Sequence, residues 1–266
     1  MIDTHAHLDF PDFDADRDAV VARAREGNVF PLITIGTDLE GCRRALDLAA
    51  RYEGVFSGLG IHPNHTKGVP EADWRAFEAL FDDPAVRPRV LAVGETGLDY
   101  YRDHSPRDVQ ETAFRRQIRL ARRHRLPVVV HCREAYARCA EVIEEEIAKE
   151  GPVAGVMHCF AGTVEDARRC LAFGFHLSFA GPITYKKNDA LREVARAAPR
   201  DRILVETDCP FLPPEPYRGK RNEPLYTRLT ADALARARGE SLVDVEAATD
   251  RNARALFAFP AAGGSR

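Results

Sequence analysis

The sequence lacks the features typical of membrane, secreted and disulfide-stabilised proteins. Its apolar runs all fall short of the ~18 residues that a membrane-spanning helix needs. Its first residues have neither the basic start nor the apolar segment of a signal peptide. Its six cysteines form no C-x-x-C pair, which argues against a disulfide framework in a chain of 266 residues. We therefore expect a cytoplasmic protein with reduced thiols and no membrane partner.

The chain also has little net charge. Its 38 Lys and Arg against 41 Asp and Glu give a net charge of −3, which argues against a general basic coat for nucleic acid but allows a local basic patch. Lysine is scarce, with five residues against 33 arginines. We attribute this ratio mainly to coding bias, although arginine suits phosphate recognition. Neither a Gly-rich phosphate loop nor a Ser/His/Asp nucleophile arrangement is evident.

Short apolar runs rich in β-branched residues alternate with longer amphipathic segments along the chain. The expected strands are residues 1–5, 30–36, 55–61, 90–95, 127–131, 153–158, 175–179 and 203–208. The expected helices are residues 15–27, 39–52, 71–82, 106–125, 134–149, 164–173, 188–198, 223–238 and 241–258. We expect Ser105 and Thr163 to cap two of these helices. Eight β-then-α units predict a single-domain (β/α)8 TIM barrel over residues 1–260, followed by a disordered tail at 261–266.

A doubly wound open sheet would give a similar pattern of strands and helices. Histidine, glutamate or aspartate, the residue types that bind metal ions or protons, however, stand at or just after the end of six of the eight expected strands. They are His5 and His7, His62, Glu95, His131, His158 and Asp208. A closed barrel brings the carboxyl ends of all its strands to one place, whereas an open sheet would not. This distribution therefore favours the barrel.

The first two of these histidines have the spacing of a metal-binding pair. Residues i and i+2 of an extended chain project to the same side, so His5 and His7 can hold one cation. A pair of surface histidines is the alternative interpretation. Glu95 ends an apolar run, where a buried carboxylate needs a partner, and an arginine could provide a salt bridge instead of a metal.

The remaining three candidates, like Glu95, have both a metal-binding interpretation and a purely structural one. His131 and His158 also end apolar runs and could be hydrogen-bonded core residues, while Asp208 could cap the next segment. Together the six ligands His5, His7, Glu95, His131, His158 and Asp208 exceed the three that an open catalytic site usually offers one ion. They suit two divalent ions, which could clamp a phosphodiester and lower the pKa of a shared water. Sequence does not choose among Mg, Mn and Zn.

The same residues lie in a series of motifs that resembles a known family. The motifs are DTHAHL at 3–8, GIHP at 60–63, GETGLDY at 94–100, PVVVHCR at 127–133, HCFAG at 158–162, ETD at 206–208 and RGKRNEP at 218–224. In this order they resemble the TatD-type metal-dependent deoxyribonucleases, which belong to the amidohydrolase-like barrels. The resemblance implies a distorted TIM barrel with a dinuclear site. It implies that His5, His7, Glu95 and Asp208 hold one ion, and that Glu95 bridges to a second ion on His131 and His158.

The resemblance also implies an activity, 3′-to-5′ exonuclease cleavage of DNA, for which single-stranded ends are the expected substrate. Asp208 and Glu95 are then the expected catalytic residues, with Asp208 also orienting or deprotonating the water. We expect the substrate phosphates to be bound by His62, Arg133, Arg218, Lys220 and Arg221. The alternatives are a turn-stabilising role for His62, a salt bridge for Arg133 and a solvated loop for residues 218–221.

Other functions remain compatible with the same residues. A metal-dependent ester or amide hydrolase, such as a D-aminoacyl-tRNA deacylase, is the main alternative, because one site can serve many chemistries. A non-catalytic binding module on a decayed barrel is a further alternative, which the full ligand set disfavours. No obligate protein partner is evident. One barrel occupies the chain, so the mouth of the site and its loops must bind any DNA.

Overall fold

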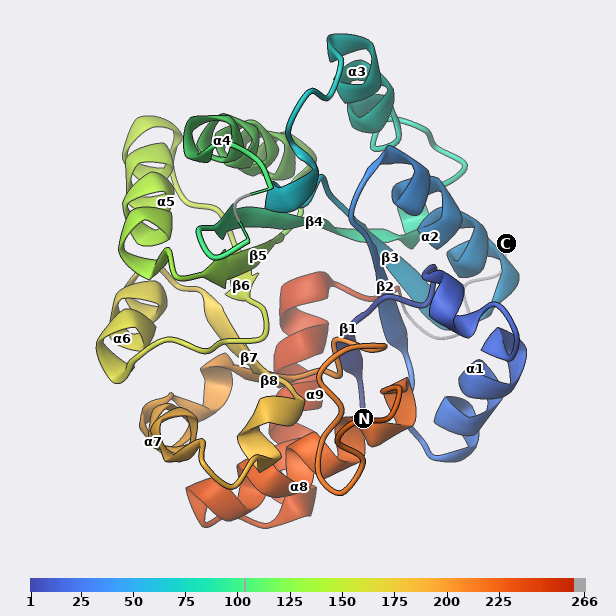
Figure 1. The fold of residues 1–266 in the computed structure, drawn as a ribbon, viewed down its shortest axis with the longest axis vertical. Helices are drawn as coiled ribbons and strands as arrows, with labels where there is room; N and C mark the ends of the chain where they lie inside the picture. Colours follow the sequence, from blue (N-terminus) through green and yellow to red (C-terminus); the bar gives the residue numbers. More distant parts are fainter. Residues whose placement is uncertain (103, 261–266) are drawn as a thin grey trace.

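Eight parallel strands, in the order β1 to β8, form a nearly closed barrel surrounded by helices (Figure 1). This computed structural model describes residues 1–102 and 104–260, so the tail expected to be disordered lies outside the described residues. Within the described part, no helix combines the length and apolar character needed to cross a bilayer. All six cysteines are free thiols, as expected.

The observed elements agree with the expected ones to within a few residues. The strands are β1 Asp3–Ala6, β2 Leu32–Gly36, β3 Val55–Leu59, β4 Val90–Asp99, β5 Val128–Arg133, β6 Gly155–Met157, β7 His176–Phe179 and β8 Ile203–Val205. The helices are α1 Arg17–Glu26, α2 Leu39–Arg51, α3 Glu71–Ala79, α4 Arg107–His124, α5 Tyr136–Glu150, α6 Val164–Ala172, α7 Asp189–Ala197, α8 Thr227–Arg238 and α9 Leu242–Phe257. The predicted (β/α)8 architecture is confirmed.

Only one of the two predicted helix caps is present. Thr163 caps α6 in a reciprocal capping box with Asp166, as predicted. The prediction for Ser105 was wrong, because Pro106 occupies the N-cap position of α4. The hydroxyl oxygen of Ser105 instead accepts a hydrogen bond from the backbone N–H of Lys67, at 3.0 Å. The serine therefore joins two loops rather than starting the helix.

The barrel closes between β1 and the segment that follows β8. The N–H of His7 donates to the carbonyl of Cys209 at 2.8 Å, and the N–H of Asp208 donates to the carbonyl of His5 at 2.9 Å. The buried carboxylate of Asp3 strengthens this seam by accepting hydrogen bonds from the N–H and the hydroxyl of Thr207. These contacts therefore place His5, in the first strand, and His7, just after it, beside Asp208, which follows the last strand.

Strand alternation divides the barrel interior into an apolar and a polar layer. Val129, Val156 and Leu204 belong to one buried cluster inside the barrel. Phe257 of α9 packs in the same cluster, and Figure 1 shows α9, in red, within the ring of strands in projection. The residue two positions further along each of these three chain segments is His131, His158 or Glu206. Because residues i and i+2 of a strand point to the same face, His131, His158 and Glu206 form the next layer of the interior, directly beyond the aliphatic layer.

Candidate metal centre

Two glycines shape β4 so that Glu95 enters the barrel centre. Gly94 and Gly97 have φ angles of +139° and +140°, which residues with a Cβ rarely adopt. A Cβ at Gly97 would lie 2.0 Å from the carbonyl oxygen of His131, and one at Gly94 would lie 2.4 Å from that of Val129. The pairing of β4 with β5 shifts register between Val93 and Thr96. The glycines thus permit the bulge that carries Glu95.

The two oxygens of Glu95 face two different pairs of imidazoles. Its Oε2 lies 3.4 Å from Nε2 of His5 and 3.6 Å from Nε2 of His7. Its Oε1 lies 2.8 Å from Nδ1 of His131 and 2.8 Å from Nε2 of His158. The carboxylate therefore stands between histidines from β1 and from the ends of β5 and β6. Imidazoles surround it, rather than the arginine considered as an alternative.

Asp208 completes the first of these groups. Its Oδ1 lies 3.3 Å from Nε2 of His7 and 3.6 Å from Nε2 of His5, while the two Nε2 atoms are 3.2 Å apart. The backbone of Asp208 is left-handed, with φ +58°, as is that of Cys159 directly after His158, with φ +43°. Left-handed residues in two of the site-bearing loops are consistent with a backbone shaped for function. The structure thus brings all six predicted ligand residues together.

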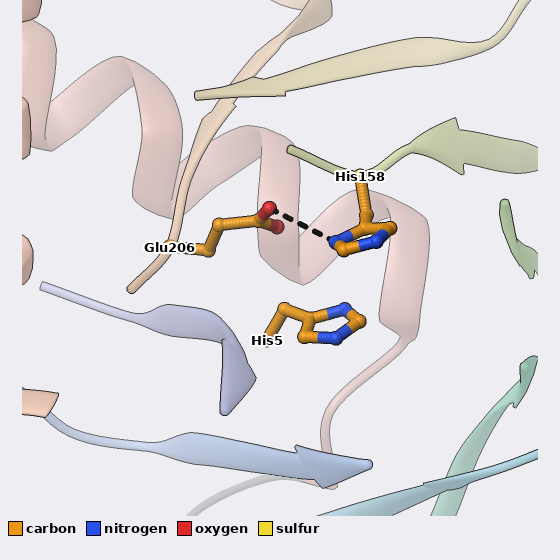
Figure 2. A group of neighbouring side chains, drawn as sticks. All are labelled: His5, His158 and Glu206. Carbon is orange, nitrogen blue, oxygen red and sulfur yellow. Dashed lines mark ion pairs between the residues drawn. The ribbon is translucent and has the colours of Figure 1, made fainter. Parts of the chain in front are cut away.

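Three of the four histidines have an acceptor near the outer nitrogen, whereas Nδ1 of the buried His5 has no hydrogen-bond partner among the residues that the structure describes. Nδ1 of His7 lies 2.9 Å from the carbonyl oxygen of Ile35, and Nε2 of His131 lies 3.3 Å from Oδ2 of Asp99. Nδ1 of His158 lies 3.3 Å from Oε1 of Glu206, the contact drawn in Figure 2. An acceptor at the outer nitrogen keeps the proton there and leaves a lone pair on the inner nitrogen, the usual arrangement for metal-binding histidine.

His62 has the opposite arrangement. Its Nδ1 accepts a hydrogen bond from the backbone N–H of Asn64 at 3.1 Å, so the neutral ring carries its proton on Nε2. That Nε2 lies 3.4 Å from Oε1 of Glu95. Burial lowers the pKa of His62 to about 4, which keeps the ring neutral. His62 both stabilises its turn, as the alternative interpretation had it, and offers an N–H donor to the site.

The chemistry of the donor set fits divalent metal ions. Inner imidazole lone pairs and carboxylate oxygens converge within 2.8–3.6 Å, a repulsive arrangement unless protons or cations lie among them. Burial raises the pKa of Glu95, but His158, His62 and the hydrogen bonds of His131 outweigh it and hold that pKa well below its usual value. Burial opposes a charge on His7, yet Asp208 and Glu95 raise its pKa to about 9. Protons and metal ions therefore compete for these nitrogens.

Sequence reasoning missed two buried carboxylates that support the ligands. Glu206 accepts hydrogen bonds from the N–H of Cys159 at 2.5 Å and from the hydroxyl of Ser178 at 2.6 Å, beside His158. In Figure 2 it lies next to His158, whose ring stacks on His5 with 4.0 Å between centroids. Asp99 supports His131 in the same way. Alternation could have pointed to Glu206, which stands two residues before Asp208, but not to its role, which depends on partners from other strands and loops.

Glu206→Gln is expected to weaken metal binding by about 10- to 100-fold, the usual effect of losing such a supporting carboxylate. The glutamine oxygen can still accept from the N–H of Cys159 while its NH2 group donates to the hydroxyl oxygen of Ser178, so the substitution removes mainly the negative charge beside Nδ1 of His158. Zinc titration against a competing chelator measures the effect. Glu165→Gln is the matched control, because the Glu165 side chain is 82% exposed. An unchanged affinity would contradict the supporting role.

The site opens into a cavity of about 670 Å³. Of the predicted phosphate-binding residues, His62 and Arg133 line this cavity. The guanidinium of Arg133 lies 3.8 Å from the ring centroid of Tyr101, which is 54% exposed. Arg133 therefore stands at the mouth of the site on an aromatic support.

The other three predicted phosphate-binding residues lie outside the cavity lining, in the loop between β8 and α8. The guanidinium of Arg221 binds both carboxylate oxygens of Asp16, at 2.7 and 2.8 Å. This pair fastens the loop to the segment before α1, so Arg221 is engaged in an ion pair rather than available at the site. Arg218 and Lys220 are exposed and lie against the rings of Tyr185 and Tyr217, at 4.3 and 5.9 Å.

A parallel barrel whose strand ends gather histidines and carboxylates is the architecture of a metal-dependent hydrolase. This chain belongs to the TatD family: residues 2–258 match the family described as TatD related DNase. It is 38% identical over 257 residues to the uncharacterized metal-dependent hydrolase YabD of Bacillus subtilis, covering 97% of this chain and 98% of YabD. It is also 38% identical over 262 residues to the 3′-5′ ssDNA/RNA exonuclease TatD of Cronobacter turicensis, covering 97% of each.

Among solved structures, the chain is similar to YJJV, a TatD homolog from Escherichia coli K12. The TM-score is 0.90, with 31% sequence identity and coverage of 98% of both chains. The family and the single-domain distorted barrel predicted from the sequence are thus confirmed. The chain is a metal-dependent hydrolase of the TatD family.

Proposed function

We propose that this protein removes nucleotides from the 3′ end of single-stranded DNA, with two divalent metal ions bound at the six ligand residues. The observation that carries the proposal is Glu95, whose two oxygens each face a separate group of donors. A carboxylate placed in this way can bridge two ions. The name of the Cronobacter relative, 3′-5′ ssDNA/RNA exonuclease, supports the substrate and the polarity.

Two ions would be held by two sets of residues, which the contacts of Glu95 separate. His5, His7 and Asp208 join its Oε2, whereas His131 and His158 join its Oε1. Bound ions would supply Lewis acidity and an acidified water between them, the contribution of two-metal sites to phosphodiester hydrolysis. The protein's part is to orient these donors, which the outer-nitrogen contacts of His7, His131 and His158 do.

Asp208 is the group that handles the proton. Its Oδ1 faces His5 and His7, which leaves Oδ2 to orient the attacking water and accept its proton. Asp208 also lines the cavity, so a substrate there would meet this carboxylate directly. Burial raises its pKa, but the hydrogen bond from His7 and the charges of His158 and His5 outweigh burial and keep the carboxylate ionised.

The cavity walls provide donors for the phosphate and aromatic surface for the base. The Nε2–H of His62 and the guanidinium of Arg133 would donate to the non-bridging oxygens of the scissile phosphate. Phe211, which is 47% exposed, also lines the cavity and packs edge-on against Phe10, with 5.6 Å between ring centroids. Such a ring can stack on an unpaired base of any sequence. These features suit an unpaired strand end.

Arg133→Ala is expected to raise KM for single-stranded DNA about tenfold, the loss of about 1.4 kcal/mol of binding. The change removes a phosphate donor but none of the metal ligands, so kcat and metal content should stay close to the parent values. Steady-state kinetics and metal analysis on the same preparations measure both. Arg168→Ala, an exposed arginine of α6, is the control. An unchanged KM would show that Arg133 does not contact the substrate.

The test of the proposed function is a substrate panel with defined metals. The protein is stripped of metal, reloaded with Mg, Mn or Zn, and given 5′-labelled single-stranded DNA, the corresponding duplex and aminoacyl-tRNA. We expect labelled products that shorten stepwise from the 3′ end of the single strand, and no products after chelation. Deacylation of the aminoacyl-tRNA by metal-loaded protein that leaves DNA intact would overturn the proposal.

A further inference from the structure

The few lysines of this chain are unevenly distributed. Three of the five, Lys186, Lys187 and Lys220, stand in two loops at the carboxyl ends of β7 and β8. All three are exposed, as is Arg218. Over the residues that the structure describes, no carboxylate lies within 4.0 Å of any of these three ammonium groups. Arg221, in the same loop as Lys220, is by contrast held in an ion pair by Asp16.

The two loops form one connected surface. The guanidinium of Arg218 lies 4.3 Å from the ring centroid of Tyr185. The hydroxyl of Tyr185 donates to the carbonyl of Pro213 at 3.1 Å, and the N–H of Glu215 donates to the hydroxyl of Thr184 at 2.9 Å. In Figure 1 the orange loop after β8 lies beside the gold turn that precedes α7. We call the surface formed by Tyr185, Lys186, Lys187, Arg218 and Lys220 the β7–β8 platform.

The platform adjoins the catalytic cavity. Pro182 and Leu212, one from each of the two loops, line the cavity. Each loop therefore contributes to the cavity wall and, a few residues further on, to the platform. Two acidic groups close in sequence to these cations are partly engaged: Glu215 lies 4.0 Å from Arg218, and Asp189 binds Arg192 at 2.8 Å. With four cationic side chains against these two carboxylates, the platform is locally positive on a chain of net charge −3.

We propose that the β7–β8 platform binds the backbone phosphates of the nucleic-acid strand upstream of the end that enters the cavity. The inference rests on the proposed nuclease function and names the surface that holds the body of its substrate. Lysine ammonium groups without carboxylate partners are suited to phosphate contact, because they need break no ion pair to make it. Strands long enough to reach the platform should therefore bind more tightly than short ones.

The experiment compares two variants with the same change in charge. The platform variant is Lys186→Gln with Lys187→Gln, and the control variant is Lys67→Gln with Lys149→Gln, the remaining two lysines of the chain. Binding of a fluorescent single strand of about 20 nucleotides is measured at several salt concentrations with a chelator present, so that nothing is cleaved. Hydrolysis of the strand and of bis(p-nitrophenyl) phosphate, a diester too small to reach the platform, is measured with metal.

We expect the platform variant to bind the strand about tenfold more weakly, with a salt dependence of log K less steep by about 1.4, corresponding to two lost phosphate contacts. Its hydrolysis of the small diester should equal that of the parent, and the control variant should match the parent throughout. Equal strand binding by the two variants would overturn the proposal that the β7–β8 platform binds the strand. A parent that binds the strand but cleaves neither compound would instead overturn the proposed function.

Discussion

Asp208→Asn is expected to lower kcat for single-stranded DNA by about 10³-fold, the scale of losing a general base. Asparagine has the same shape as aspartate and tolerates the left-handed backbone found here, φ +58°. The N–H of residue 208 would still donate to the carbonyl of His5 and close the barrel. The amide, however, cannot accept a proton from the attacking water. The variant should therefore fold normally and fail at the chemical step.

Three measurements on one preparation separate the loss of the general base from a loss of folding or of bound metal. The midpoint of thermal unfolding reports the fold, metal analysis reports the ligand set, and kcat reports the chemistry. Asp47→Asn, at an exposed position on α2, controls for the change in net charge. Activity within tenfold of the parent would rule out Asp208 as the base. Activity lost only in proportion to lost metal would reduce Asp208 to a ligand.

The barrel and the gathering of the six candidate ligands could be predicted from the sequence because both depend on local patterns. Glu95, His131 and His158 each directly follow a short apolar run, and strand alternation then fixes the face on which each side chain lies. Val129 and His131 show this, since the valine lies in the interior cluster and the histidine faces Glu95. Closure of the barrel then gathers the candidate ligands, because it brings the strand ends to one place whatever their separation in the chain.

Roles that depend on a distant partner could not be predicted in this way. Arg221 was expected to bind phosphate, but its guanidinium binds Asp16, 205 residues away in the chain. No spacing rule reveals such a pair. Glu206 was visible as a strand residue, yet its function depends on Ser178 and His158, which belong to other strands and loops. The tautomer of His62, which distinguishes it from the ligand histidines, depends on the turn that brings the N–H of Asn64 to its Nδ1.

Glu95→Gln is expected to reduce bound metal from two ions per chain to one or fewer, and to reduce activity at least as much as Asp208→Asn. The carboxylate offers one oxygen to His5 and His7 and the other to His131 and His158. A glutamine amide has one oxygen, and its NH2 group would donate to imidazole nitrogens that should bind metal. Whichever way the amide turns, one of the two groups loses its carboxylate oxygen. Glu165→Gln again serves as the exposed control.

The two active-site variants must therefore fail in different ways if the carboxylates have different roles. Metal analysis should find the ions retained in Asp208→Asn and depleted in Glu95→Gln. Because a ligand that binds only the folded state stabilises it, a chelator should lower the unfolding temperature of the parent and of Asp208→Asn much more than that of Glu95→Gln. Two tightly bound ions in Glu95→Gln would contradict the bridge, since the geometry gives each group of imidazoles only one oxygen of Glu95.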